Sequence, residues 1–150
     1  MHFRYKLIST PYPVISLGGR FVRPRPLVDV SVIGRHGTRI RQALLDSGAD
    51  DTVFDAALAA VIGVDLTNAA TVSVNLAAAG GMIPVRYAPV MLRLTDGREM
   101  REWPATIGFT SARLVYPLLG FAGCLQFFDA KFRGDVEIVE LTTNALYPGT

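Results

Sequence analysis

Residues 44–53 read Leu44-Leu45-Asp46-Ser47-Gly48-Ala49-Asp50-Asp51-Thr52-Val53, an apolar run that delivers one carboxylate into a Ser-Gly turn and is followed at once by an acidic pair. Serine and glycine are frequent turn residues, so an Asp-Ser-Gly tripeptide alone is most often an ordinary loop. The tripeptide occurs once in this chain. Its apolar lead-in and the acidic pair behind it indicate that this turn carries chemistry.

The residues before the turn predict a β-hairpin. In residues 27–33 β-branched residues alternate with Asp29 and Ser31, which is the period of a half-buried strand. Residues 34–37 read as a turn, and residues 38–45 as a returning strand that becomes wholly apolar as it enters the core. This pattern predicts that Asp46 lies at the end of a core strand.

The residues after the turn predict one helix and then a long hairpin. Residues 55–62 are alanine-rich and stop at Gly63, and Asp55 can serve as the N-cap, so we expect a short helix there. Residues 71–76 and 82–94 have strand composition, with the small residues 77–81 between them. They predict a hairpin with a pliable tip.

The last third of the chain continues in short strands. We expect strands over residues 99–109 and 114–120, a short helix over 121–128 and a final hairpin over 131–141. Many short strands with one or two short helices indicate an all-β fold, a closed or nearly closed β-barrel.

Prolines set the first thirty residues apart. Pro11, Pro13, Pro24 and Pro26 remove backbone donors, which favours an extended arm or an edge strand over a central strand. We therefore divide the chain into an N-terminal arm or extension, residues 1–24, and one domain, residues 25–150.

Chain length, composition and net charge limit the classes of protein to which this chain can belong. A chain of 150 residues without internal repeats, half of it hydrophobic, is the size of one ordinary compact domain. Its net charge of +2 is too small to argue for a nucleic-acid partner. Several arginines nevertheless lie in the first third of the chain, so a basic barrel that binds RNA is considered as a weaker alternative to the functions discussed below.

The cysteine content and the hydropathy of the chain indicate the cellular compartment in which we expect the protein. Cys124 is the only cysteine, which excludes an internal disulfide and reads best as a small buried apolar residue. No Cys/His cluster has the spacing of a metal site, so no metal or cofactor is expected. The N-terminus lacks the apolar core of a signal peptide, and no apolar run approaches the ~20 residues of a membrane helix. We expect a cytoplasmic protein with no membrane partner.

The three aspartates of the turn could instead suggest a calcium loop. An EF-hand needs Asp or Asn at its third position, glycine at its sixth and glutamate at its twelfth. Counted from Asp46, this chain has Gly48, Asp51 and Ala57 at those positions. The spacing excludes that reading.

Four segments taken in order resemble the retropepsins, the retroviral-type aspartic proteases and their cellular relatives. The turn of residues 44–53 resembles their active-site loop, residues 25–28 the segment before their first barrel strand, residues 80–87 their flap, and residues 118–120 the motif that braces the active-site loop. The resemblance covers roughly residues 25–128. It implies an acid-protease barrel that acts as a homodimeric aspartic endopeptidase on peptide or protein substrates.

The resemblance implies that Asp46 is the catalytic aspartate. Two carboxylates must face one water, so a chain with a single Asp-Ser-Gly takes the second from another copy of itself. At ~4 Å and an effective dielectric of ~20, two such charges repel by ~4 kcal/mol, so one of the two carboxyls keeps its proton near neutrality. This is the established behaviour of aspartic protease dyads.

The resemblance also implies roles for the neighbours of Asp46. Ser47 and Gly48 support the active-site loop, and the Ser47 hydroxyl grips the partner across the dimer axis. The substrate is bound by six residues: Ala49, Asp50, Asp51, Gly80, Gly81 and Leu118. Arg25 and Asp50 are expected to pair between subunits, so Arg25, Asp50 and Ser47 are the predicted dimer residues.

The chain departs from the family after the bracing glycine, and an alternative function is also compatible with its sequence. Retroviral enzymes usually follow the bracing glycine with an arginine of the dimer salt-bridge network, whereas this chain has Phe121 and Ala122. The alternative function is a retropepsin-like dimerisation or peptide-binding module without turnover, because a fold can persist without its chemistry.

Overall fold

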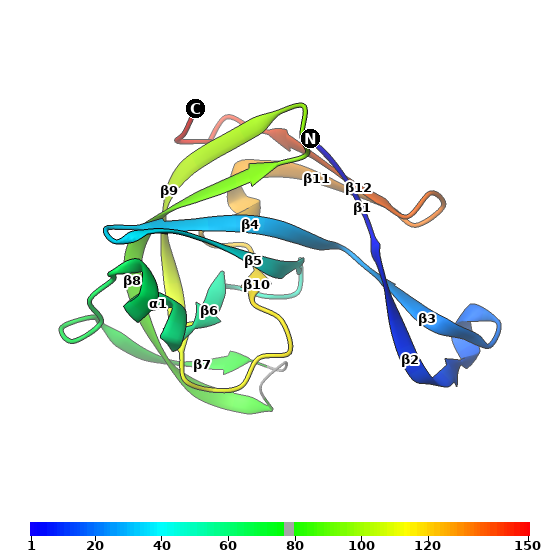
Figure 1. The fold of residues 1–150 in the computed structure, drawn as a ribbon, viewed down its shortest axis with the longest axis horizontal. Coiled ribbons are helices and arrows are strands. Elements are labelled where there is room, and N and C mark those ends of the chain that lie inside the picture. The colour runs from blue at the N-terminus through cyan, green and yellow to red at the C-terminus, as the bar shows by residue number, and fades with distance from the viewer. Residues whose placement is uncertain (77–79) are drawn as a thin grey trace.

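The computed structural model describes residues 1–76 and 80–150 and is dominated by strands, as the sequence predicts (Figure 1). The largest sheet has the strand order β4-β5-β10-β6-β9-β8-β7, and a further pairing of β4 with β8 closes part of it into a ring. Its strands are β4 (Leu27–Gly34), β5 (Gly37–Leu45), β6 (Val53–Asp55), β7 (Thr71–Leu76), β8 (Gly81–Thr95), β9 (Met100–Thr110) and β10 (Leu118–Leu119).

Alternating burial shows that the strands of this sheet turn one face toward the interior. In β4 the side chains of Val28, Val30 and Val32 are buried while Asp29 is exposed, so one face of the strand points inward. Trp103 of β9 lies fully buried, and its indole N–H donates to the Gly123 carbonyl at 2.9 Å. This bond satisfies the one polar group of the largest core side chain.

The predicted helix is confirmed as α1 (Ala56–Ile62). The Asp55 carboxylate accepts a hydrogen bond from the Leu58 N–H at 2.9 Å, which caps the first turn. Gly63 ends the helix with a φ of 77°, a conformation that glycine adopts without strain. The side chains of Leu58 and Ile62 are fully buried and fix the helix to the core.

The predicted long hairpin is formed by β7 and β8, with Leu76 opposite Gly81 at its far end. Gly80 and Gly81 have φ values of 86° and 139°, so the end of the hairpin uses conformations that favour glycine. Residues 77–79, which the sequence also assigns to the tip, lie outside the described residues.

Two predictions in the last third are wrong. The strand expected over residues 114–120 is reduced to β10, which has only two residues, and the helix expected over 121–128 is a single 3₁₀ turn, η3 (Leu125–Phe127). Phe121 and Ala122 are held against the loop, since their backbone N–H groups donate to the carbonyls of Ala49 and Asp50, and the backbone of Cys124 after them, with φ −138° and ψ −77°, is not helical. Gly123, with a φ of 87°, then turns the chain toward η3.

The two ends of the chain come together beside the ring. β1 (His2–Arg4), β12 (Ile138–Thr143) and β11 (Phe128–Arg133) form a three-stranded sheet, in which β11 and β12 are the predicted final hairpin. β2 (Lys6–Val14), the 3₁₀ turn η1 (Ile15–Leu17) and β3 (Arg20–Arg25) make a separate two-stranded hairpin, which places the proline-rich residues in edge strands. Within residues 1–76 and 80–150, no helix has the length and apolar character needed to cross a bilayer.

Candidate active site

Asp46 follows the last residue of β5 and opens a loop that reaches β6, with β10 inserted between those two strands. Leu118 and Leu119 pair in parallel with Leu44 and Leu45, and Leu118 also pairs with Val53 on the other side. The Asp46 N–H donates to the Leu119 carbonyl at 3.1 Å. The loop of residues 46–52 therefore spans a strand that arrives from far along the chain.

Backbone hydrogen bonds hold the far side of the same loop. The Phe121 N–H donates to the Ala49 carbonyl at 2.9 Å, and the Ala122 N–H donates to the Asp50 carbonyl at 2.8 Å. The Ala122 carbonyl accepts from the Thr52 N–H at 3.0 Å. These main-chain bonds fix the backbone of the loop from which the three carboxylates project.

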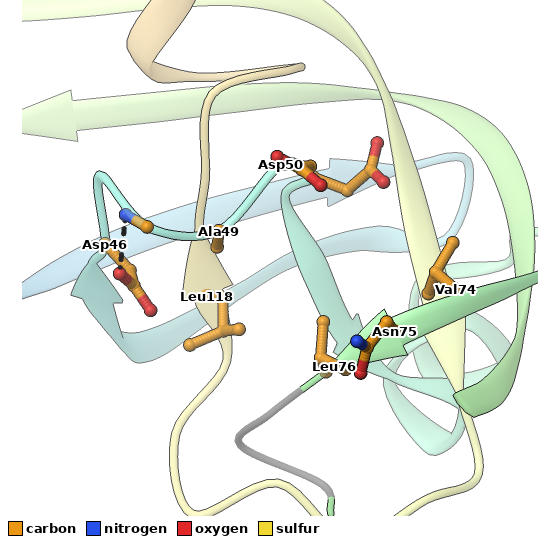
Figure 2. Close-up of a pocket in the computed structure, with 9 residues that line it drawn as sticks. Asp46, Ala49, Asp50, Val74, Asn75, Leu76 and Leu118 are labelled. Carbon is orange, nitrogen blue, oxygen red and sulfur yellow. Dashed lines mark hydrogen bonds between the residues drawn. The ribbon is translucent and has the colours of Figure 1, made fainter. Parts of the chain in front are cut away.

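The Asp46 carboxylate is half-buried and is oriented by its own loop. Its Oδ1 atom accepts a hydrogen bond from the Gly48 N–H at 2.9 Å, the dashed line in Figure 2. Across the part of the chain that the structure describes, no lysine, arginine or histidine forms an ion pair with Asp46, Asp50 or Asp51. The loop thus presents three carboxylates whose charges are not neutralised within the protomer.

These carboxylates border a partly open cavity of about 480 Å³. The loop and β10 contribute one wall, and the end of β7 contributes the other, as Figure 2 shows with Asp46 and Leu118 on one side and Asn75 and Leu76 on the other. The lining residues are Asp46, Gly48, Ala49, Asp50, Asp51, Val74, Asn75, Leu76 and Leu118. A cavity lined by carboxylates, an amide and apolar side chains can hold an extended chain with polar backbone and apolar side chains.

The structure brings together six of the residues predicted from sequence, namely Asp46, Gly48, Ala49, Asp50, Asp51 and Leu118. Ser47 is exposed and does not line the cavity. Gly80 and Gly81 lie at the end of the β7–β8 hairpin, also outside the lining. Arg25 ends β3 next to Pro26, whose carbonyl accepts from the Leu45 N–H at 3.0 Å, so Arg25 approaches the loop along the backbone.

Sequence reasoning missed the residues that β7 contributes. Val74, Asn75 and Leu76 line the cavity because β7 pairs with β8 and its end lies across from the loop. The predicted hairpin could have indicated these residues, since the residues just before the tip of a hairpin pair with those just after it.

Tyr87 of β8 was also missed, and it is the clearest electrostatic feature of the site. Burial raises the pKa of Tyr87 to about 12, and the Asp51 carboxylate adds to this by accepting a hydrogen bond from the phenol and by its negative charge. Tyr87 pairs with Gly108, whose missing side chain leaves room for the tyrosine ring and for Val85. The Tyr87 phenol therefore stays protonated beside the Asp51 carboxylate at neutral pH.

Two other chemistries have no support at this site. Cys124 is fully buried, as its sequence context predicts, and burial raises the pKa of its thiol to about 12, so it is neither accessible nor ionised near neutrality. The described residues contain no group of three or more His, Cys, Asp or Glu side chains that could hold a metal ion.

Comparison with protein-family models finds no match, and comparison with curated protein sequences finds none either.

Proposed function

We propose that the chain is an aspartic endopeptidase of the retropepsin type, active as a homodimer in which two copies of Asp46 share one site. The proposal rests on the position and the contacts of the Asp46 carboxylate. Its carboxylate stands at the end of a core strand, is oriented by the Gly48 N–H at 2.9 Å, lines an open cavity and has no ion pair within residues 1–76 and 80–150. A permanent internal ion pair would have removed it from acid–base chemistry.

The proposed reaction needs one ionised and one protonated carboxyl. The ionised Asp46 takes a proton from a bridging water, whose oxygen attacks the carbonyl carbon of the peptide bond. The protonated Asp46 of the second copy donates its proton to the carbonyl oxygen, which gives a neutral tetrahedral intermediate. Collapse of the intermediate breaks the C–N bond as the first Asp46 gives its proton to the leaving amine and the second Asp46 takes a proton from a hydroxyl of the intermediate, which forms the product carboxyl and restores the starting pair. No step requires a metal or a covalent enzyme intermediate.

The rest of the cavity supports an extended peptide substrate. β7 and the active-site loop face one another across a space of about 480 Å³, and Leu76 and Leu118 offer apolar surface there. A peptide bound as a strand would leave apolar side chains against these residues and polar backbone beside Asp50 and Asp51. The proposed substrates are accordingly unfolded or extended segments with apolar residues.

The first experiment compares Asp46→Asn with Asp129→Asn in the cleavage of an unfolded protein substrate. Asp129 is an exposed aspartate of β11 without an ion pair in the described chain, so it controls for the loss of one charge. We expect Asp46→Asn to lower kcat/KM by at least about 100-fold, because a positioned acid–base group contributes that much or more. Asp129→Asn should match the wild type. Equal activity of Asp46→Asn would remove Asp46 from the mechanism.

A second experiment tests whether the site is shared between subunits. Mixing equal amounts of wild-type and Asp46→Asn chains at constant total concentration should leave about one quarter of the activity, because only dimers with two intact aspartates turn over. An independent site in each protomer would leave about half. Binding of an extended peptide that is unaffected by Asp46→Ala, with no cleavage by the wild type, would favour the alternative of a binding module.

A further inference from the structure

The hairpin of residues 6–25, here called the arm, exposes more large apolar side chains than its own two strands can cover. It stands apart from the rest of the molecule in Figure 1, where β2 and β3 extend away from the ring. Tyr12, Ile15 and Phe21 are 78%, 80% and 59% exposed, and Leu7 and Leu17 are also exposed. Because an isolated two-stranded hairpin is at best marginally stable in water, this apolar surface indicates a partner.

The orientation of the arm is fixed by an ion pair and by backbone hydrogen bonds. Arg20 forms an ion pair with Glu137 at 3.5 Å, and the Tyr5 N–H donates to the Glu137 carbonyl at 2.8 Å. At the tip the Gly19 N–H donates to the Val14 carbonyl at 3.0 Å, and the Val14 side chain is buried. The exposed side chains are therefore presented on a formed hairpin and are not folded back on the body.

The charge of the chain is divided in a way that favours a second copy as the partner. The arm, residues 6–25, contains four of the fifteen basic residues and none of the thirteen acidic ones. The other 130 residues thus hold eleven basic and thirteen acidic residues, for a net charge of −2. Arg23 and Arg25 of the arm have no ion pair in the described chain, and neither have Asp50 and Asp51 of the loop. A cationic arm and an anionic body attract one another between copies.

The arm is also continuous with the place where a second copy has to dock. Its last strand, β3, ends at Arg25, and the carbonyl of the next residue, Pro26, accepts a hydrogen bond from Leu45, the residue before Asp46. A partner that brings its own Asp46 to this Asp46 therefore comes close to the root of the arm. No other partner is required by the site.

We propose that each arm clasps the body of the partner protomer, with Tyr12, Ile15 and Phe21 buried against it. This inference rests on the proposed homodimer and names the surface that holds it together.

The test replaces the three arm side chains and, as a matched control, three exposed apolar side chains elsewhere. The arm variant is Tyr12→Ser/Ile15→Ser/Phe21→Ser, and the control is Val61→Ser/Met100→Ser/Val115→Ser, whose side chains are 44%, 54% and 80% exposed. Sedimentation equilibrium at pH 7 measures the dimer Kd. We expect the arm variant to weaken the dimer by about 30-fold or more and the control by less than about threefold, because anchors buried at an interface dominate affinity.

Activity measurements then separate this inference from the proposed function. The arm variant should be inactive when dilute and regain the wild-type kcat per dimer at high concentration. A dimer Kd equal to that of the wild type overturns the clasp and leaves the protease proposal standing. A wild-type chain that stays monomeric at about 100 µM overturns both. Loss of binding to a single-stranded oligonucleotide with an unchanged dimer Kd would assign the arm to nucleic acid and overturn the clasp.

Discussion

Asp46 and Leu119 are joined by a backbone hydrogen bond of 3.1 Å, from the Asp46 N–H to the Leu119 carbonyl. The bond ends the parallel pairing of β10 with β5, so the position of the carboxylate depends on a strand from the last third of the chain. Any change that displaces residues 118–122 is therefore expected to disturb the candidate active site as well as the fold.

Gly120 offers a direct test of that dependence. A Cβ atom added there would overlap the Asp51 carbonyl and lie 2.7 Å from the Ala49 oxygen, and neither backbone group can move aside cheaply. We expect Gly120→Ala to lower the free energy of unfolding by about 2 kcal/mol or more, as overpacking commonly does. Gly134→Ala, where the new Cβ would meet open space, is the control. Equal urea midpoints for the two variants would contradict the close packing at Gly120.

Tyr87 gives the site a dependence on alkaline pH. Because its pKa is raised from 10.0 to about 12 in the folded state, the folded protein holds the phenolic proton more tightly than the unfolded chain does. The resulting stability is fully present below pH 10 and is lost as the pH rises toward 12. The difference in urea midpoint between the wild type and Tyr87→Phe should therefore shrink over that range. A difference that is constant from pH 9 to 12 would show that Tyr87 titrates normally.

The Cys124 thiol should not react with thiol reagents in the native protein. The thiol is fully buried, and burial raises its pKa to about 12, so the reactive thiolate is absent at pH 8. A thiol reagent such as 5,5′-dithiobis(2-nitrobenzoic acid) should label one thiol per chain in guanidinium chloride and none in the native state on the same timescale. Rapid labelling of the native protein would mean that the core around Cys124 opens readily.

Thr52 carries the one buried side-chain polar atom that has no hydrogen-bond partner among the described residues, its Oγ1. Valine has nearly the same shape and removes the uncompensated hydroxyl, so Thr52→Val should leave the free energy of unfolding unchanged or raise it by about 1 kcal/mol. For a chain of this size, the corresponding rise in Tm is about 2–4 °C. A clear loss of stability would mean that the hydroxyl has a partner in solution, such as a bound water.

Predictions from sequence succeeded where the chemistry is local. The helix of residues 56–62 was predictable because the Asp55 cap and the Gly63 stop lie next to it in the chain. The hairpins of β4 with β5 and of β7 with β8 were predictable from alternating polarity and the glycines at their turns. Asp46 at the end of a strand follows from the same apolar run.

The errors lie where a distant segment competes for the same backbone groups. Residues 114–117 have strand composition, but the inserted strand pairs only through Leu118 and Leu119 before the chain turns behind the loop. The segment after it has the composition of a helix, but the N–H groups of Phe121 and Ala122 donate to loop carbonyls, and Gly123 and Cys124 then have non-helical backbone conformations. Composition does not report such long-range hydrogen bonds.

The sequence by itself determined that the chain is mostly β, that one acidic turn follows a core strand and that the proline-rich start forms edge strands. These features depend on side chains within a few residues of one another. Only the tertiary structure decided which residues face Asp46 across the cavity, that Tyr87 lies beside Asp51, and that the apolar side chains of the arm are left uncovered. Those relationships depend on strand pairing and burial between segments far apart in the chain, which local periodicity does not encode.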